Sequence, residues 1–436
     1  MTGTAAATPD RASGGDRATV DVVVIGAGTS GLVAAIRLAQ AGLRVQVLAA
    51  GHGCLTLAPG VVDVLGYAPE RVGDPAQALD GFVAAHGDHP YAHAGRDGLD
   101  RALAWFRETV APLGYVGALS HNRLLPTAIG GLRPSCLVPR TMAAGDLSAG
   151  GEVLVVGFHG LRDFHPALVA ANLRAAVPAP GNVVAARAAT LEWPGPSSDG
   201  RPLTLARRLE DPSLRAAVAR DLRGVLGDEP LVGMPAVLGV DRWQEVWAGL
   251  QDAAGRPVFE IPLVPPSIPG LRLFDLLRRA LRTAGGRLEV GTPVTGARQI
   301  AGQVEAVTVA RPPREEVIPA RWVVLATGGI GSGGLQADPD GTVREPILGL
   351  PVHGLPVPGD PWTLPDYFAS HPVDRAGLAV DDAWRPVDRA GRVVASNLHA
   401  VGAALVGCEP WREQSGEGIS IASGYLAASA ILEGAG

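Results

Sequence analysis

The sequence predicts an α/β fold, with a Rossmann-like domain that contains a parallel sheet and a β-meander, and an inserted α/β or α+β region that caps it. Three observations predict this fold. A glycine-rich turn joins a strand to a helix near residue 26, an apolar strand returns near residue 325, and an apolar helix opens on glycines near residue 416. Strands and helices in this order are typical of nucleotide-binding α/β proteins.

The glycine-rich turn has the sequence Gly-Ala-Gly-Thr-Ser-Gly and begins at Gly26. Residues 20–25 before it are apolar and β-branched, as in a buried parallel strand, and residues 32–40 after it have apolar positions at helical spacing. Gly26 allows the tight turn, Gly28 lets backbone amides approach a phosphate, and Gly31 lets the helix pack on the strand. We expect a nucleotide phosphate at the helix N-terminus. The residues expected to bind it are Gly26, Gly28, Ser30 and Gly31. The alternative is a glycine-rich turn in an α/β fold without a ligand.

One residue that dinucleotide sites commonly carry is missing. The second strand, residues 44–48, is followed by Ala49, Ala50 and Gly51, where an Asp or Glu usually holds the ribose hydroxyls of the adenosine. A full FAD or NAD lacks that anchor here. A mononucleotide does not need it.

The second half of the chain points to a flavin. An amphipathic helix over residues 271–284 carries four arginines that we expect on its solvated side: Arg272, Arg278, Arg279 and Arg282. A strand at 287–290, a hairpin around 301–302 and an apolar strand running into Thr327 and Gly328 follow. Nicotinamide dehydrogenases continue with simple βα repeats, whereas two-domain flavoproteins return in this way. We therefore expect Thr327 and Gly328 to contact a flavin.

The C-terminal segment adds the third element. Residues 398–402 form a strand ending in Gly402, and Gly416 and Gly418 open an apolar helix. In such flavoproteins this helix points its N-terminus at the flavin, where the positive helix end stabilises the anionic reduced form. We expect flavin contacts at Gly402, Gly416 and Gly418. The alternative is an ordinary closing helix of an α/β domain.

Composition excludes several classes of function. The chain has 436 residues, 47% of them hydrophobic, and a net charge of −6, which does not suggest a nucleic-acid partner. All 37 basic residues are arginines, which excludes a Schiff-base lysine. The three cysteines form no CxxC, so we expect no metal site and no cluster held by this chain alone. We expect no apolar run long enough for a membrane span, and hence no direct span. Residues 1–18 lack an apolar segment and predict a disordered tail.

The chain resembles the B subunit of anaerobic glycerol-3-phosphate dehydrogenase, in the fumarate-reductase-like flavoprotein superfamily. The resemblance covers nearly the whole chain after the tail. Its most distinctive motifs are Pro265-Pro266-Ser267 and the run Arg-Glu-Pro-Ile-Leu-Gly-Leu at 344–350. Further matching stretches are residues 24–32, 89–91, 132–133, 155–164, 234–236, 263–264, 270–273 and 332–335.

The resemblance implies a non-covalently bound flavin, taken to be FMN, with FAD as the alternative. It also implies two partners, an A subunit that carries FAD and oxidises glycerol 3-phosphate, and an iron–sulfur C subunit that delivers electrons to membrane quinone. The chain is then cytoplasmic and peripheral on the inner membrane through these partners. Two other functions stay open: a self-sufficient flavin oxidoreductase acting on a small hydroxy acid or polyol phosphate, and a non-catalytic assembly subunit.

We expect a discontinuous flavin-binding domain, residues 19–66 and 265–436, with residues 67–264 inserted. Asp63 lies where such folds bring a loop past the flavin, so it is a further candidate contact. The sequence departs from the family at Glu417, which interrupts the usual run of glycines at the start of the last helix. A carboxylate beside a reduced flavin opposes the anionic form, so Glu417 either points away from it or lowers its potential. No catalytic residue can be assigned.

Overall fold

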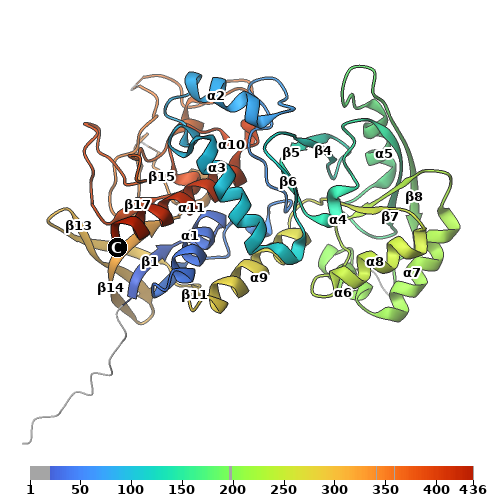
Figure 1. Cartoon of the computed structure of the whole chain (residues 1–436), viewed down its shortest axis with the longest axis horizontal. Coiled ribbons are helices and arrows are strands. Elements are labelled where there is room, and N and C mark those ends of the chain that lie inside the picture. Colours follow the sequence, from blue (N-terminus) through green and yellow to red (C-terminus); the bar gives the residue numbers. More distant parts are fainter. Residues whose placement is uncertain (1–19, 196–198, 340, 358, 436) are drawn as a thin grey trace, which may run out of the picture.

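The computed structural model describes residues 20–195, 199–339, 341–357 and 359–435, so the predicted tail over residues 1–18 lies outside the described residues. Two lobes lie side by side (Figure 1). The larger lobe is formed by the N-terminal and C-terminal parts of the chain, and the smaller one by its middle. Each lobe has its own sheet and its own hydrophobic core.

The larger lobe contains a seven-stranded sheet with the order β11-β2-β1-β14-β13-β12, in which β17 also pairs with β14. The strands β11, β2, β1, β14 and β17 pair in parallel, and β12, β13 and β14 form an antiparallel meander. This confirms the predicted α/β fold. The bounds are β1 Val20–Ile25, β2 Val45–Ala49, β11 Arg287–Val290, β12 Val294–Ile300, β13 Gln303–Arg311, β14 Arg314–Leu325 and β17 Leu398–Ala400.

Helices of the larger lobe pack on this sheet and on one another. The helix α1 (Thr29–Gln40) is buried along most of its length and packs against α11 (Gly416–Ala435). On its other side α11 packs against α3 (Pro90–Thr109). Figure 1 shows α1 and α11 running alongside each other over the sheet. Small residues allow this close approach: a Cβ at Gly424 would lie 2.4 Å from the carbonyl oxygen of Ser30.

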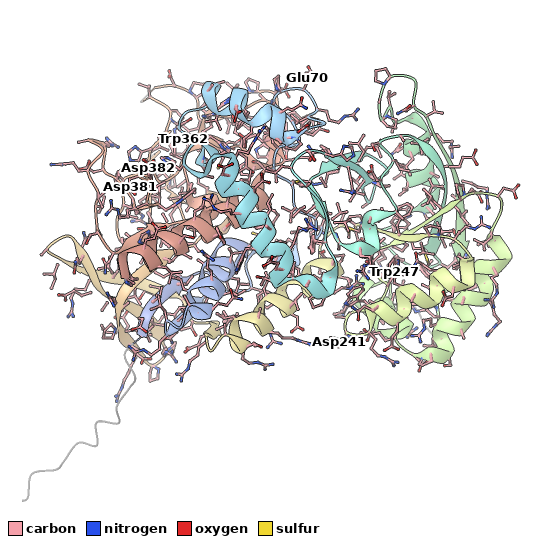
Figure 2. The ribbon with its side chains drawn as sticks, viewed as in Figure 1. Glu70, Asp241, Trp247, Trp362, Asp381 and Asp382 are labelled. Atoms are coloured by element: carbon pink, nitrogen blue, oxygen red, sulfur yellow. The ribbon has the colours of Figure 1, made fainter. Side chains whose placement is uncertain are left out.

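The smaller lobe is a second parallel α/β unit. Its four strands have the order β10-β9-β7-β8, and all three pairings are parallel. Trp247 lies in this lobe (Figure 2) and donates a hydrogen bond from Nε1 to the Val258 carbonyl oxygen at 2.7 Å. The bounds are β7 Gly151–Phe158, β8 Val184–Leu191, β9 Leu231–Pro235, β10 Val258–Ile261, α5 Pro166–Ala175, α6 Pro202–Leu209, α7 Pro212–Val225 and α8 Trp243–Ala254.

Between the two units the chain adds short elements. The helix α2 and much of α3 contribute buried side chains to the core of the larger lobe, whereas residues 147–268 supply the second core. The domain limits at residues 67 and 264 stay a prediction. The remaining bounds are α2 Pro75–Ala85, β3 Val116–Gly117, β4 Arg123–Pro126, β5 Leu132–Ser135, β6 Leu137–Val138, α4 Arg140–Ala143, α9 Ile268–Thr283, β15 Gln336–Ala337, β16 Val343–Arg344 and α10 Pro410–Glu413.

Arg272 corrects one expectation from the sequence. It lies on α9 and is expected on a solvated face, but its side chain is 3% exposed. Its two terminal guanidinium nitrogens donate to the Glu260 carboxylate at 2.7 and 2.9 Å, and its Nε donates to the Gly239 carbonyl oxygen at 2.9 Å. Glu260 belongs to β10, so this buried ion pair joins the two lobes.

The last helix corrects a second expectation. Gly416–Ala435 is long and apolar enough to cross a membrane, judged by length and composition alone, whereas no such run is expected from the sequence. In this structure half of its most apolar window is buried inside the protein. Because α11 packs against both α1 and α3, its apolar side chains have partners within the chain.

Candidate functional site

A cavity of about 720 Å³ lies at the carboxyl ends of β1, β2 and β14, where ligands gather in parallel α/β sheets. The glycine-rich turn forms one wall, and the start of β12 and the first turns of α11 contribute others. The residues that line it are 25–30, 48–51, 53–55, 293–295, 326–328, 332–334, 336, 346–347, 403, 417 and 420.

The glycine-rich turn has the geometry of a phosphate site. Gly26 has φ +116°, and a Cβ there would lie 2.2 Å from the Ala326 carbonyl oxygen. Gly31 does not line the cavity; a Cβ there would lie 2.2 Å from the Gly26 carbonyl oxygen, so its role is close packing. Gly28 differs from both because no described atom lies within 4 Å of its Cβ position. The free space above Gly28 fits an approaching ligand.

The helix that follows this turn offers unpaired amides. Gly28 is the N-cap of α1 with extended backbone (φ −73°, ψ 179°), and no side chain of the described residues caps the helix. The first amides of a helix have no partner within it, and the helix dipole adds positive charge there. Ser30 and Thr29 line the cavity at this end. The residues present therefore fit an anionic phosphate group.

The strand end near residue 327 also fits a bound group. Thr327 and Gly328 both line the cavity. The Oγ1 atom of Thr327 is buried and has no hydrogen-bond partner among the described residues. A buried polar atom without a partner is costly, so a ligand atom that pairs with Thr327 stabilises the site. Gly328 has φ +80°, and a Cβ there would lie 2.6 Å from Ser332 Oγ.

The three predicted glycines at the C-terminal segment lie behind the cavity wall. A Cβ at Gly402 would lie 2.4 Å from Ser30 Oγ, and a Cβ at Gly418 would lie 2.4 Å from the hydroxyl of Tyr91. Gly416 sits beside Pro410, at 3.4 Å by the same measure. These three residues do not line the cavity, so they shape its wall from outside. Their contact with a flavin stays a prediction.

Asp63 is also absent from the cavity lining. It is 2% exposed, and its carboxylate accepts hydrogen bonds from Arg133 Nε at 2.8 Å and from Ser135 Oγ at 2.7 Å. Its backbone carbonyl oxygen accepts from the Gly418 amide at 2.9 Å. The side chain of Asp63 is thus fully paired within the protein and holds β5 against the start of α11.

Glu417 lines the cavity but is not among the residues that the sequence predicts to contact the flavin. It lies in the first turn of α11 and lines the cavity, as does Thr29 at the start of α1. Burial raises the pKa of Glu417 to about 7, and the charge of Asp63 adds to this, although Thr29 and Arg133 act in the opposite direction. Among the described residues that line this cavity, Glu417 is the sole carboxylate and no arginine or histidine is present.

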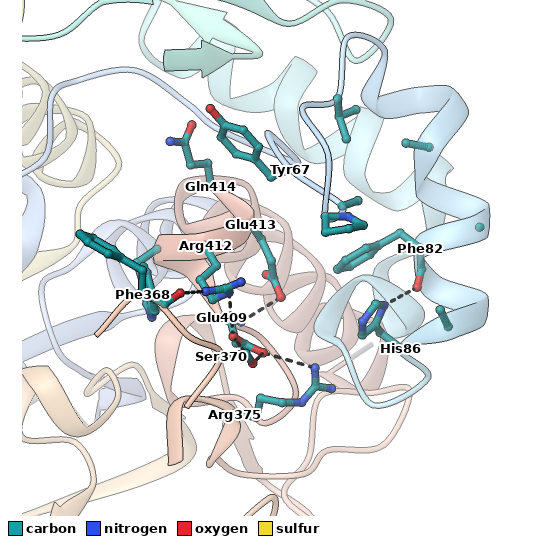
Figure 3. A pocket seen from close by; sticks show the side chains of 17 residues that line it. Tyr67, Phe82, His86, Phe368, Ser370, Arg375, Glu409, Arg412, Glu413 and Gln414 are labelled. Carbon is teal, nitrogen blue, oxygen red and sulfur yellow. Dashed lines mark hydrogen bonds and ion pairs between the residues drawn. The ribbon is translucent and has the colours of Figure 1, made fainter. Parts of the chain in front are cut away.

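A second cavity, of about 830 Å³, lies between α2, α10 and residues 368–375 (Figure 3). Its wall is made of side chains, with aromatic rings such as Phe82 and Phe368 beside paired charges. Glu409 accepts hydrogen bonds from Ser370 Oγ at 2.7 Å and lies 3.8 Å from Arg375. It contains none of the residues predicted to hold a cofactor.

Comparison with known proteins identifies the family of the chain. The sequence model of the family described as "FAD binding domain" matches residues 21–419. The probable anaerobic glycerol-3-phosphate dehydrogenase B subunit of Halobacterium salinarum is 36% identical over 427 residues, covering 95% of this chain and 98% of that protein. The corresponding B subunit of Pectobacterium carotovorum is 31% identical over 429 residues, covering 95% and 98%.

Among solved structures, the 3-ketosteroid delta1-dehydrogenase of Sterolibacterium denitrificans matches with a TM-score of 0.49 and 12% identity, covering 95% of this chain and 100% of that one.

The fold, the cavity and the family match define a flavin-dependent oxidoreductase. The two relatives are 36% and 31% identical to this chain over nearly its whole length, which narrows the class of oxidoreductase to one family. The chain belongs to the family of anaerobic glycerol-3-phosphate dehydrogenase B subunits, which confirms the resemblance found in the sequence.

Proposed function

We propose that this chain is the flavin-carrying B subunit of a complex that oxidises glycerol 3-phosphate to dihydroxyacetone phosphate. The observation that carries the proposal is a flavin-type cavity in a chain that matches proteins of this name over nearly its whole length. A bound flavin would accept a pair of electrons and pass them on one at a time. The protein supplies the phosphate turn, the position of the ring and exclusion of water.

The cofactor in this proposal is FMN. The end of β2 presents Ala49 and Ala50 to the cavity, and the sole carboxylate among the described lining residues, Glu417, comes from a different element. The ribose anchor of a dinucleotide is therefore absent from the described lining. FAD is the alternative for two reasons. The cavity extends to Val294 and Thr295 at the start of β12. The family that matches the chain is described as an FAD binding domain. Chromatography of the cofactor released by denaturation separates the two, and predominant FAD would overturn FMN.

The residues proposed to contact the flavin directly are those that line the cavity. They are Gly26, Gly28, Ser30, Thr327 and Gly328. Gly31, Gly402 and Gly418 support the same walls by close packing, Gly416 lies beside Pro410, and Asp63 holds the start of α11 through its carbonyl oxygen. Apart from Glu417, the described lining residues offer no carboxylate and no histidine to act as a base towards a hydroxyl group.

The complex in this proposal has the two partners that the family resemblance implies. An FAD-containing A subunit oxidises glycerol 3-phosphate, and an iron–sulfur C subunit passes electrons to membrane quinone. The cysteines of this chain support a need for such a partner, because Cys136 and Cys408 are buried and Cys54 lies alone. The chain is then cytoplasmic and reaches the inner membrane through its partners.

A dye-reduction assay tests the proposal. The purified chain, with its visible spectrum recorded, is compared with the chain co-purified with A and C subunits, using glycerol 3-phosphate as the donor. We expect bound flavin in both samples and substantial turnover in the complex alone. Equal turnover by the isolated chain would make it a self-sufficient oxidoreductase. Absence of flavin from both samples would make it an assembly subunit.

A further inference from the structure

The charges around the flavin cavity are unusual for an anion site. A phosphate monoester carries a charge of about −1.5 to −2 at pH 7. The described residues that line the cavity include no arginine or histidine, and their one carboxylate is Glu417. Attraction of the phosphate therefore depends on backbone amides and the α1 dipole. An ionised Glu417 works against that attraction.

Glu417 lies at the same end of the cavity as the proposed phosphate site. It lines this cavity together with Thr29, the first residue of α1, and with Gly28, the N-cap of that helix. Ser420, one turn further along α11, lines the same cavity. The first turns of the two helices thus face the same cavity, so the Glu417 carboxyl group and the amides proposed to hold a phosphate share one site.

The charged groups around Glu417 do not compensate the negative charge of its ionised carboxylate. Asp63, in the loop before α2, and Arg133, on β5, both act on its charge, but the Arg133 guanidinium donates to the Asp63 carboxylate from two nitrogens. Tyr115 is the remaining titratable neighbour that interacts with it, and burial keeps the pKa of this phenol above its usual range. Since the one nearby cation is already paired, Glu417 accommodates an anion by taking up a proton.

We propose that Glu417 acts as a positioning residue that binds the flavin phosphate as a neutral carboxylic acid, so that flavin binding takes up one proton. This inference rests on the proposed function, because it needs a flavin in this cavity. The raised pKa of Glu417, about 7 without a ligand, supports it. Below that pH the acid is already protonated and the flavin binds at full strength. Above it, each pH unit costs about tenfold in affinity, since a proton must be taken up.

The test measures flavin affinity without using activity. The full chain with its flavin bound is diluted into buffers between pH 6 and 9, and released flavin is followed by its fluorescence. We expect the dissociation constant of the unaltered chain to rise about tenfold per pH unit above roughly pH 7.5. Glu417→Gln keeps a neutral hydrogen-bond donor, so its dissociation constant changes little over this range and at pH 9 lies below that of the unaltered chain.

Glu433→Gln is the matched control, because Glu433 is an exposed acid at the far end of the same helix. It is expected to keep the pH profile of the unaltered chain. An unchanged pH profile in Glu417→Gln would overturn the inference while leaving the proposed function intact. Absence of flavin binding at every pH would instead overturn the proposed function.

Calorimetry of the unaltered chain gives a second readout that needs no variant. FMN binding at pH 8 is measured in two buffers of different ionisation enthalpy. We expect uptake of close to one proton per flavin, since most Glu417 is ionised at that pH before binding. Uptake near zero would overturn the inference.

Discussion

The two lobes each contain a βαβ unit in which the first strand has a glycine at or near its end, yet only the unit in the larger lobe has the geometry that a phosphate site needs. In the larger lobe α1 begins at Thr29, directly after the open Gly28. In the smaller lobe α5 begins at Pro166, well after β7 has ended, and a Cβ at Gly157 would meet the Pro166 ring at 2.7 Å. Proline also lacks an amide N–H. Thus a glycine at the end of a strand is not enough to form a phosphate site. The helix must begin directly after the glycine, so that its first amides point into open space.

The largest expected effect concerns the contact that joins these two units. Arg272→Leu leaves Glu260 buried without its cation, and loss of one partner of a buried pair costs about 3–5 kcal/mol. We expect chemical denaturation to report a loss of this size. Arg278→Leu is the matched control on the same helix, because the Arg278 side chain is half exposed and its pair with Asp275 contributes at most about 1 kcal/mol. Equal losses in the two variants would show that the lobes are not held by this pair.

The next effect concerns the open glycine. Gly28→Val fills the space in which a phosphate approaches the amides of α1, and loss of two charge-assisted hydrogen bonds costs about 3 kcal/mol, or roughly 100-fold in flavin affinity. We expect the fold to tolerate the change, because φ is −73° and a Cβ at this position meets no described atom within 4 Å apart from its chain neighbours. Flavin absorbance and circular dichroism measure both outcomes. A folded variant with full flavin content would show that this turn does not bind the flavin.

The corresponding change in the smaller lobe gives the opposite pattern. Gly157→Ala places a methyl group 2.7 Å from the Pro166 ring, and overpacking of this kind costs about 1–3 kcal/mol. We expect a lower unfolding midpoint with unchanged flavin content per folded chain. Loss of flavin without loss of stability would mean that the smaller lobe takes part in cofactor binding, and the contrast between the units would fail.

The smallest effect concerns Thr327. Thr327→Val removes a buried hydroxyl that has no partner among the described residues, so the flavin-free chain is expected to keep or gain stability. If the flavin pairs with this hydroxyl, its loss costs about 1 kcal/mol, or roughly fivefold in affinity. Thermal unfolding with and without added flavin measures both the stability of the flavin-free chain and its affinity for flavin. An unchanged affinity would exclude Thr327 from the contacts.

The local features of the flavin domain are predictable from the sequence because each depends on neighbouring residues. Strand, turn and helix over residues 20–40 follow from β-branched residues, glycine chemistry and apolar spacing. The meander and the last helix follow in the same way. The inserted region is predictable only as α/β or α+β, since apolar runs alone do not say which strands pair.

The features that the sequence does not predict depend on residues far apart in the chain. Arg272 is expected in solvent because its own helix pattern places it off the apolar face, whereas its partners Glu260 and Gly239 come from the other lobe. The pairing of Asp63 with Arg133, 70 residues later, is likewise not visible in the sequence, and contact of Asp63 with a flavin stays a prediction. Glu417 stands out in the sequence as a departure from the family, and only the fold brings it to Thr29.

The position of β1 in its sheet has a consequence for synthesis of the protein. β1 pairs with β14, which begins about 300 residues later, and α1 packs against the final helix. At about 5–20 residues per second, the ribosome leaves this strand without one neighbour for roughly 15 to 60 seconds. During that time one edge of an apolar strand is open to other chains. The cavity wall is complete only when Glu417 and Ser420 have emerged, so we expect a chain truncated before α11 to bind no flavin.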